Sequence, residues 1–130
     1  MDQAGRTPLH YAAFDDDAET IQQLIGGGAS LDAQDNQGFT PLHLAAQEYS
    51  VAAASSLLKA GALVDLENGF GNTPLFVAVA NSKGRGELIN VLRLHGADPL
   101  HANAHGQTPV GFARLIGNYD VRRFFTDVPE

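Results

Sequence analysis

Apolar residues in this chain fall into short stretches separated by polar segments rich in Asp, Asn and Gly. Two kinds of stretch alternate. One is short and rich in small residues, and the other repeats its apolar residues every three to four positions, as one face of an amphipathic helix does. The first kind holds Leu9, Ala12 and Ala13, then Leu42, Ala45 and Ala46; the second holds Ile21, Leu24 and Ile25, then Ala54, Leu57 and Leu58. The pattern predicts pairs of helices joined by turns.

The same pattern recurs at a nearly fixed interval. Thr-Pro dipeptides begin at Thr7, Thr40, Thr73 and Thr108, at spacings of 33, 33 and 35 residues, and a glycine lies two residues before each threonine. Threonine before proline is typical of a helix start, because the hydroxyl can accept a free backbone N–H and proline fits the first helical position. Further glycines predict the ends of the second helices, at Gly28, Gly61 and Gly96.

The repeated segments TPLHYAA (7–13) and TPLHLAA (40–46) resemble the ankyrin repeat, a unit of about 33 residues. The resemblance implies an all-α solenoid of about four stacked helix-turn-helix units with β-turn or hairpin connections. We expect one domain over 1–130, with repeats at about 7–39, 40–72 and 73–107 and a partial capping repeat at 108–130. The later copies depart from the motif: Phe76 and Gly111 replace the histidine, and the third copy has two extra residues within ANSKGRGE.

Composition and charge narrow the functional classes. The chain has 130 residues, a net charge of -7 and no cysteine, which excludes disulfides and thiolate metal sites. Residues 1–67 hold ten acids and two bases (-8), and residues 68–130 hold five acids and six bases (+1). We therefore expect no nucleic-acid ligand and a partner protein with a basic surface. Without a signal peptide or a long apolar run, we expect a cytoplasmic protein that does not bind membranes.

His10 and His43 allow two interpretations, a pair of metal ligands or catalytic bases, and an architectural role. In the ankyrin family this histidine braces adjacent units through hydrogen bonds, and in a regular stack the two would lie one repeat apart, too far to share a metal. We expect the architectural role. His101 and His105 have helical zinc-site spacing but lie in a predicted turn, so we expect no metal there.

The acidic run at 15–19 has no calcium-loop pattern, and Asp17 is expected to cap the second helix. No catalytic motif stands out. We therefore expect no catalytic residue, no metal and no cofactor.

The resemblance also implies a binding surface, because ankyrin proteins bind partners along a concave strip of turn tips and first-helix edges. Mapped onto this chain, the candidate partner-binding residues are Arg6, Phe14, Asp15, Asp16, Asn36, Phe39, Gln47, Glu48, Tyr49, Phe70, Asn72, Asn81, His105 and Gln107, with Ser82 and Leu115 beside them. We expect Phe39, Tyr49 and Phe70 as apolar anchors. Asp15, Asp16 and Glu48 would form an acidic flank. Two alternatives are that some rings pack against a neighbouring turn, and that binding uses Lys83 and Arg85.

These observations favour a non-enzymatic protein-protein interaction module that is monomeric on its own. Polar residues at Thr20, Gln23 and Arg122 suggest an array capped at both ends. The closing segment ARLIGNYDVRRFF (113–125) is similar to the last repeat of small bacterial ankyrin proteins encoded beside secreted toxins. We hypothesise an immunity protein that inhibits a bacterial toxin. The alternative is a general adapter or regulatory subunit, and a third hypothesis is an enzyme with an unrecognised site.

Overall fold

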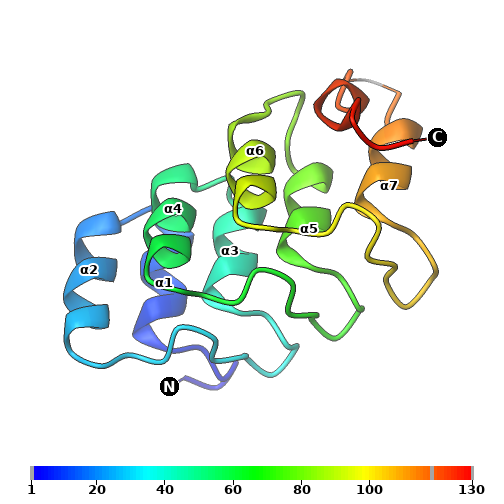
Figure 1. The fold of residues 1–130 in the computed structure, drawn as a ribbon. Coiled ribbons are helices and arrows are strands. Elements are labelled where there is room, and N and C mark those ends of the chain that lie inside the picture. Colours follow the sequence, from blue (N-terminus) through cyan, green and yellow to red (C-terminus); the bar gives the residue numbers. More distant parts are fainter. Residues whose placement is uncertain (1, 118, 130) are drawn as a thin grey trace.

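The computed structural model describes residues 2–117 and 119–129 and shows helices stacked in two rows (Figure 1). The helices are α1 (Pro8–Phe14), α2 (Ala18–Gly26), α3 (Pro41–Gln47), α4 (Val51–Lys59), α5 (Pro74–Ala80), α6 (Glu87–Leu94) and α7 (Pro109–Leu115), followed by the 3-10 turn η1 (Arg122–Phe125). The expected all-α row of paired helices is confirmed. The connections are turns, and the described residues contain no strand, so the hairpin form of the connection is not seen.

The first helix of every unit begins as the sequence predicts. Thr7, Thr40, Thr73 and Thr108 each accept a hydrogen bond from the backbone N–H three residues later, with proline at the first helical position. The second helix of each of the first three units is closed by a left-handed glycine, as at Gly61, where φ is 102°. Local sequence therefore fixes both ends of a unit.

The helices form two rows because each unit packs on the next. The inner helices α1, α3, α5 and α7 contact one another in order, and α2, α4 and α6 form the outer row. The core runs continuously between the rows and includes Leu42, Leu57, Leu75 and Ile89, each at most 1% exposed. In the described residues, no helix has both the length and the apolar character needed to cross a bilayer.

The histidine of the repeated motif connects neighbouring units. His10 Nδ1 accepts a hydrogen bond from the Thr7 backbone N–H (3.0 Å), which fixes the Nε2–H tautomer, and Nε2 donates to the Phe39 carbonyl in the turn that leads into the next unit (2.8 Å). His43 makes the same contacts with Thr40 N–H (3.1 Å) and the Asn72 carbonyl (2.8 Å). The architectural role expected for these histidines is confirmed.

The third junction uses packing in place of this bridge. Phe76 stands where the earlier units have histidine, and its ring stacks on Phe112 of the last unit at a centroid distance of 5.0 Å. A phenyl ring cannot donate to the next turn, so the fourth unit is held here by apolar contact.

The last unit has only the short turn η1 in place of a second helix, and the insertion in the third unit supports it. The α5–α6 connection spans six residues (81–86), against three in the earlier units. A Cβ at Gly86 would overlap the Phe124 ring, and Arg123 Nη2 donates to the Gly84 carbonyl (3.1 Å). The insertion therefore forms the surface on which the final turn packs (Figure 1).

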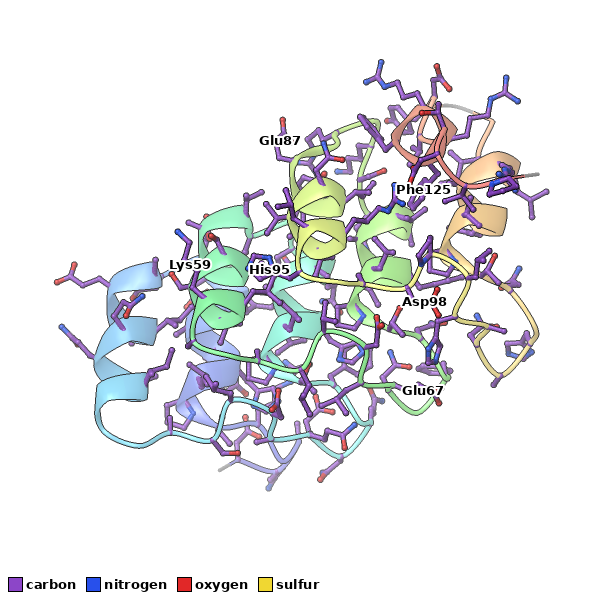
Figure 2. The ribbon with its side chains drawn as sticks, viewed as in Figure 1. Lys59, Glu67, Glu87, His95, Asp98 and Phe125 are labelled. Atoms are coloured by element: carbon purple, nitrogen blue, oxygen red, sulfur yellow. The ribbon has the colours of Figure 1, made fainter. Side chains whose placement is uncertain are left out.

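The final turn is also held by contacts with Arg93 of α6. Phe125, which lies in η1 (Figure 2), is 1% exposed, and the Arg93 guanidinium lies 5.1 Å from the centre of its ring. Arg93 also pairs with Asp127 at 2.6 Å. Arg122 and Gln23 are exposed and Thr20 is half-buried, as their polar character predicts.

Burial makes His43 a source of acid sensitivity. It lowers the pKa of His43 to about 4 in the folded protein, against about 6.5 when unfolded. Between these values the unfolded chain binds the extra proton, so stability falls as the pH falls. We expect His43 to make the free energy of unfolding roughly 2 kcal/mol smaller at pH 5 than at pH 7.5.

Urea unfolding of wild type and His43→Gln at both pH values measures this effect. The glutamine variant should show the smaller pH dependence, whereas replacing the exposed His105 with Gln should leave it unchanged. Equal pH dependence in all three proteins would contradict the assignment.

Candidate functional site

The expected binding strip is built on four copies of one turn. Each turn spans five residues, at 2–6, 35–39, 68–72 and 103–107, and its first N–H donates to the carbonyl of its last residue. The first residue is Asp2, Asp35, Asn68 or Asn103, and one side-chain oxygen accepts the N–H groups two and four residues later. The Asp and Asn residues of the polar segments therefore set the shape of the turn tips.

Neighbouring turns are joined edge to edge. Asn36 N–H donates to the Ala4 carbonyl (2.8 Å), Gly69 N–H to Gln37 (2.7 Å) and Ala104 N–H to Phe70 (3.1 Å). The glycine before each Thr-Pro permits this approach: Gly71 has φ 76°, and a Cβ there would lie 2.6 Å from the Ala104 nitrogen. The tips thus form a continuous hydrogen-bonded row whose side chains project from a fixed backbone.

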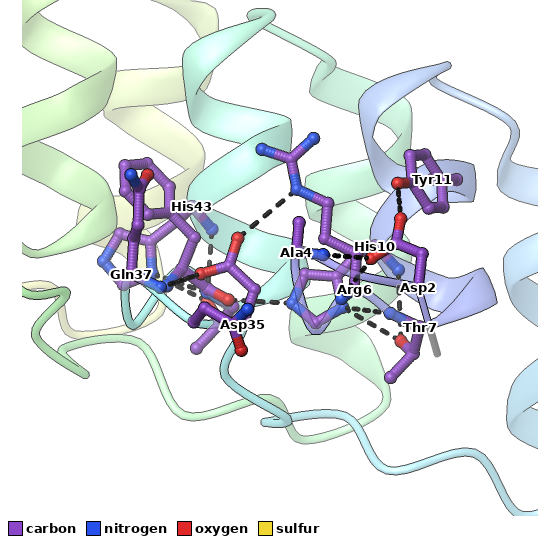
Figure 3. A network of polar contacts seen from close by, with 12 residues as sticks. Asp2, Ala4, Arg6, Thr7, His10, Tyr11, Asp35, Gln37 and His43 are labelled. Carbon is purple, nitrogen blue, oxygen red and sulfur yellow. Dashed lines mark hydrogen bonds and ion pairs between the residues drawn. The ribbon is translucent and has the colours of Figure 1, made fainter.

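A polar network joins the first two turns (Figure 3). Arg6 Nε pairs with Asp35 Oδ2 at 3.3 Å, while Asp35 Oδ1 accepts backbone N–H groups of its own turn. The Arg6 guanidinium also lies 5.9 Å from the centre of the Tyr11 ring, and the Tyr11 hydroxyl donates to Asp2. Arg6 is therefore already paired within the protein, and a hollow of about 400 Å³ adjoins it.

The structure places most of the candidate strip residues on the surface. The exposed members are Asp15, Asp16, Asn36, Glu48, Phe70, His105 and Gln107, and the half-buried members are Arg6, Phe14, Phe39, Gln47, Asn72 and Asn81. Phe70 has 54% of its surface exposed at the tip of the third turn. The Phe39 ring lies 5.6 Å from the ring of His43, so part of it packs against the helix α3 that follows it.

Tyr49 was expected as an exposed anchor, and this expectation is wrong. The residue is 8% exposed, and its hydroxyl donates to the Arg85 carbonyl (2.6 Å) and accepts Leu88 N–H (3.3 Å). Burial raises the pKa of Tyr49, which keeps the phenol protonated as a donor. Ser82 is also buried, at 1% exposed, and its hydroxyl donates to the Val79 carbonyl (3.0 Å).

Tyr49 and Asp16 share one structural role. Each has a left-handed backbone, with φ of 54° and 55°, in the connection between the two helices of its unit. Asp16 Oδ1 accepts Ala53 N–H at 2.8 Å in the first turn of α4, as Tyr49 accepts Leu88 N–H in the first turn of α6. Neither α4 nor α6 has a side-chain cap from its own N-cap residue. Each of these helices is therefore capped by the unit before it.

The end units differ from this arrangement. Helix α2 is capped by its own Asp17, which accepts Thr20 N–H at 3.1 Å, as expected from the sequence. In the third unit the left-handed residue is Lys83, with φ 52°. An ammonium group has no lone pair to accept an N–H, so it cannot cap the next helix. The following element is only the short turn η1.

Sequence analysis missed Tyr11, which is 43% exposed and joins the Arg6 network. The signal was present in the motif, because Tyr11 stands where the second unit has Leu44, and Leu44 is fully buried. A tyrosine in place of a buried leucine indicates a position on an inner helix where no neighbouring unit packs over the side chain.

The polar clusters offer little for metal or cofactor chemistry. His101 is not helical, and its Nε2 pairs at 2.6 Å with Oε2 of Glu67, which lies in the connection between α4 and α5 (Figure 2). Asp65, beside this pair, accepts Asp98 N–H at 3.1 Å, and burial raises its pKa. Within the described residues, no group of three or more His, Cys, Asp or Glu side chains is arranged to hold a metal ion.

Two family models match the sequence. One, described as "Ankyrin repeats (3 copies)", covers residues 1–68, and a second, described as "Ankyrin repeat", covers residues 70–104. A comparison with curated proteins gives no significant match.

The cap that Asp16 supplies to α4 can be removed by one substitution. Replacing Asp16 with Ala should lower the free energy of unfolding by about 1 kcal/mol, the usual cost of a lost helix cap. Asp16→Asn keeps an acceptor oxygen and tolerates the left-handed backbone, so it should stay close to wild type. Urea unfolding measures both variants. Asp15→Ala is the matched control, and an equal loss for Asp15→Ala and Asp16→Ala would contradict the assignment.

Proposed function

Because this chain belongs to the ankyrin repeat family, we propose that it is a non-enzymatic module whose partner protein docks on the concave strip. Ankyrin repeats generally mediate protein-protein interactions. The row of joined turn tips supports the proposal, because it presents side chains from a rigid backbone and lowers the entropy cost of binding.

We propose that the partner has a basic surface, and the charge of the first two units supports this. Residues 1–67 have a net charge of -8, and Asp15 and Glu48 stand exposed on the strip. The carboxylates of Asp2 and Asp16 accept backbone N–H groups and are exposed, so they add to the negative field while serving the fold. A surface of this kind attracts a basic partner and accelerates its association.

We propose further that the partner is a toxin and that this chain is its immunity protein. Carboxylates on the strip would take the place of phosphates in a basic cleft, such as that of a nuclease, and the array would exclude the substrate by covering the cleft. Phe70 supplies an exposed aromatic side chain at the tip of the third turn. Inhibition of this kind needs no catalysis by the array.

A general adapter or regulatory subunit is the second candidate, and one observation favours it. Residues 68–130 carry a net charge of +1, so the two halves of the array differ in the partner chemistry they suit. An adapter uses such a difference to hold two proteins at once, whereas an inhibitor needs only one.

Quantitative affinity capture from the source cells tests the strip. We expect Phe70→Ala to weaken retention of the captured partner about 30-fold, which corresponds to the loss of a true anchor. Leu94→Ala removes an exposed apolar side chain from the outer helix α6 and should leave retention unchanged. If Phe70→Ala retains the partner as well as wild type does, the binding surface lies elsewhere.

The acidic flank is tested with the paired variant Asp15→Asn and Glu48→Gln, which removes charge and keeps shape. Association with the captured partner should slow by roughly tenfold at low salt and approach the wild-type rate at high salt. The matched control is Glu19→Gln on the outer helix α2. A rate that is insensitive to salt in wild type would contradict a basic partner.

The immunity hypothesis is decided by co-expression. Cells that produce the toxin encoded by the adjacent gene should grow only when this chain is present, and the strip variant Phe70→Ala should protect them less well. Equal growth with and without the chain would reject immunity and leave the adapter function.

A further inference from the structure

A hollow of about 360 Å³ opens at the far end of the array, between the C-terminal ends of α5 and α7. Its floor and walls are largely apolar and come from both units, chiefly Val79, Ala80, Phe112, Leu115, Ile116 and Tyr119. Leu115 is 73% exposed and Tyr119 is 46% exposed. The volume lies in the range of small-ligand pockets and is ample for one or two large apolar side chains.

A second hollow of about 520 Å³ adjoins the first and shares Ile116, Gly117 and Tyr119 with it. Arg114, Arg122 and Asp120 line this polar part. Arg114 is held by the Val128 carbonyl (2.9 Å), and Arg122 is only loosely paired with Asp120, at 3.8 Å. The two hollows therefore adjoin at Ile116, Gly117 and Tyr119, and we refer to them together as the trough, apolar at one end and cationic at the other.

Lys83 adds a positive charge at the apolar end. It lines the first hollow and is exposed, and among the described residues no hydrogen bond or ion pair involves its ammonium group. As shown above, it stands where the earlier units place a helix-capping side chain. The charge at this position is therefore available to a ligand.

The walls of the trough are firmly supported. The Tyr119 ring packs on Gly84, where a Cβ would lie 3.1 Å from it, and the Phe112 ring stacks on Phe76. The Arg123 contact with the Gly84 carbonyl ties the final turn to the insertion. The trough therefore belongs to the packed end of the array, and its shape does not depend on a partner.

We propose that this trough binds an acidic peptide segment of a partner protein. A large apolar side chain of the segment fills the hollow between α5 and α7, and neighbouring Asp or Glu carboxylates contact Lys83 and Arg122. Apolar burial supplies affinity, and the cations select acidic over basic sequences. This chemistry is opposite to that of the first two units, and the proposal holds whether or not the chain is an immunity protein.

A random peptide display library selected against the full-length protein tests the proposal without a known partner. Enriched peptides should carry a Leu, Ile, Phe, Tyr or Trp within three residues of an Asp or Glu. Enriched peptides that are basic or uncharged would overturn the proposal. A library that shows no enrichment over an unrelated protein would overturn it as well.

Matched variants then locate the binding. The dissociation constant of a synthetic copy of the most enriched peptide, measured by fluorescence polarisation, should rise at least tenfold for Leu115→Glu and for Lys83→Glu. The controls make the same changes at exposed residues of the outer row, Leu94→Glu and Lys59→Glu, and should stay within twofold of wild type. Because Leu115 and Lys83 are both exposed, the variants should fold, and thermal unfolding verifies this.

Equal weakening by test and control variants, or no weakening by the test variants, would place the peptide elsewhere and overturn the proposal. The strip variant Asp15→Asn and Glu48→Gln should leave peptide binding unchanged. That outcome separates this trough from the proposed docking strip, so either proposal can fail while the other stands.

Discussion

Hydrogen bonds that pass from one unit to the next are the constraint on which the whole array depends. A single pair of helices leaves a turn, a histidine and a helix start with unsatisfied polar groups, and the neighbouring unit completes all three. His10 and His43 donate across the first two junctions, and the turn tips are joined at each of the three. Because buried polar groups are costly when unpaired, these contacts fix the register of the stack as well as its stability.

The two candidate surfaces arise from the same stacking but differ in chemistry. In the first two units, Asp2 closes a turn and Asp16 caps α4 while both face solvent, so groups that serve the fold also contribute to the negative field. At the other end, the last unit has only the short turn η1 in place of a second helix, and Leu115 is exposed in a hollow that Lys83 also lines. Charge and apolar character thus change along the array because the last unit is built differently from the first two.

Sequence analysis predicted the parts of the structure that depend on local signals. The Thr-Pro starts, the glycine ends and the Asp17 cap are short-range features, and all are confirmed. The bridges from His10 and His43 span 29 residues, and they were expected from the resemblance to the ankyrin repeat. Tyr49 was misassigned because its partners lie 36 and 39 residues away, which no local pattern reveals. The purpose of the insertion was also missed, since the Tyr119 and Phe124 rings that pack against Gly84 and Gly86 lie more than 30 residues further along the chain.

The borrowed helix caps give the array a direction. Each capping side chain precedes, in the sequence, the helix that it caps. Asp16 caps α4, Tyr49 caps α6, and α2 is capped by its own Asp17. When the first unit opens, α4 loses the cap that Asp16 supplies. When the last unit opens, no earlier helix in the described part of the chain loses a side-chain cap of this kind. The contribution of these caps to local unfolding is therefore asymmetric along the array.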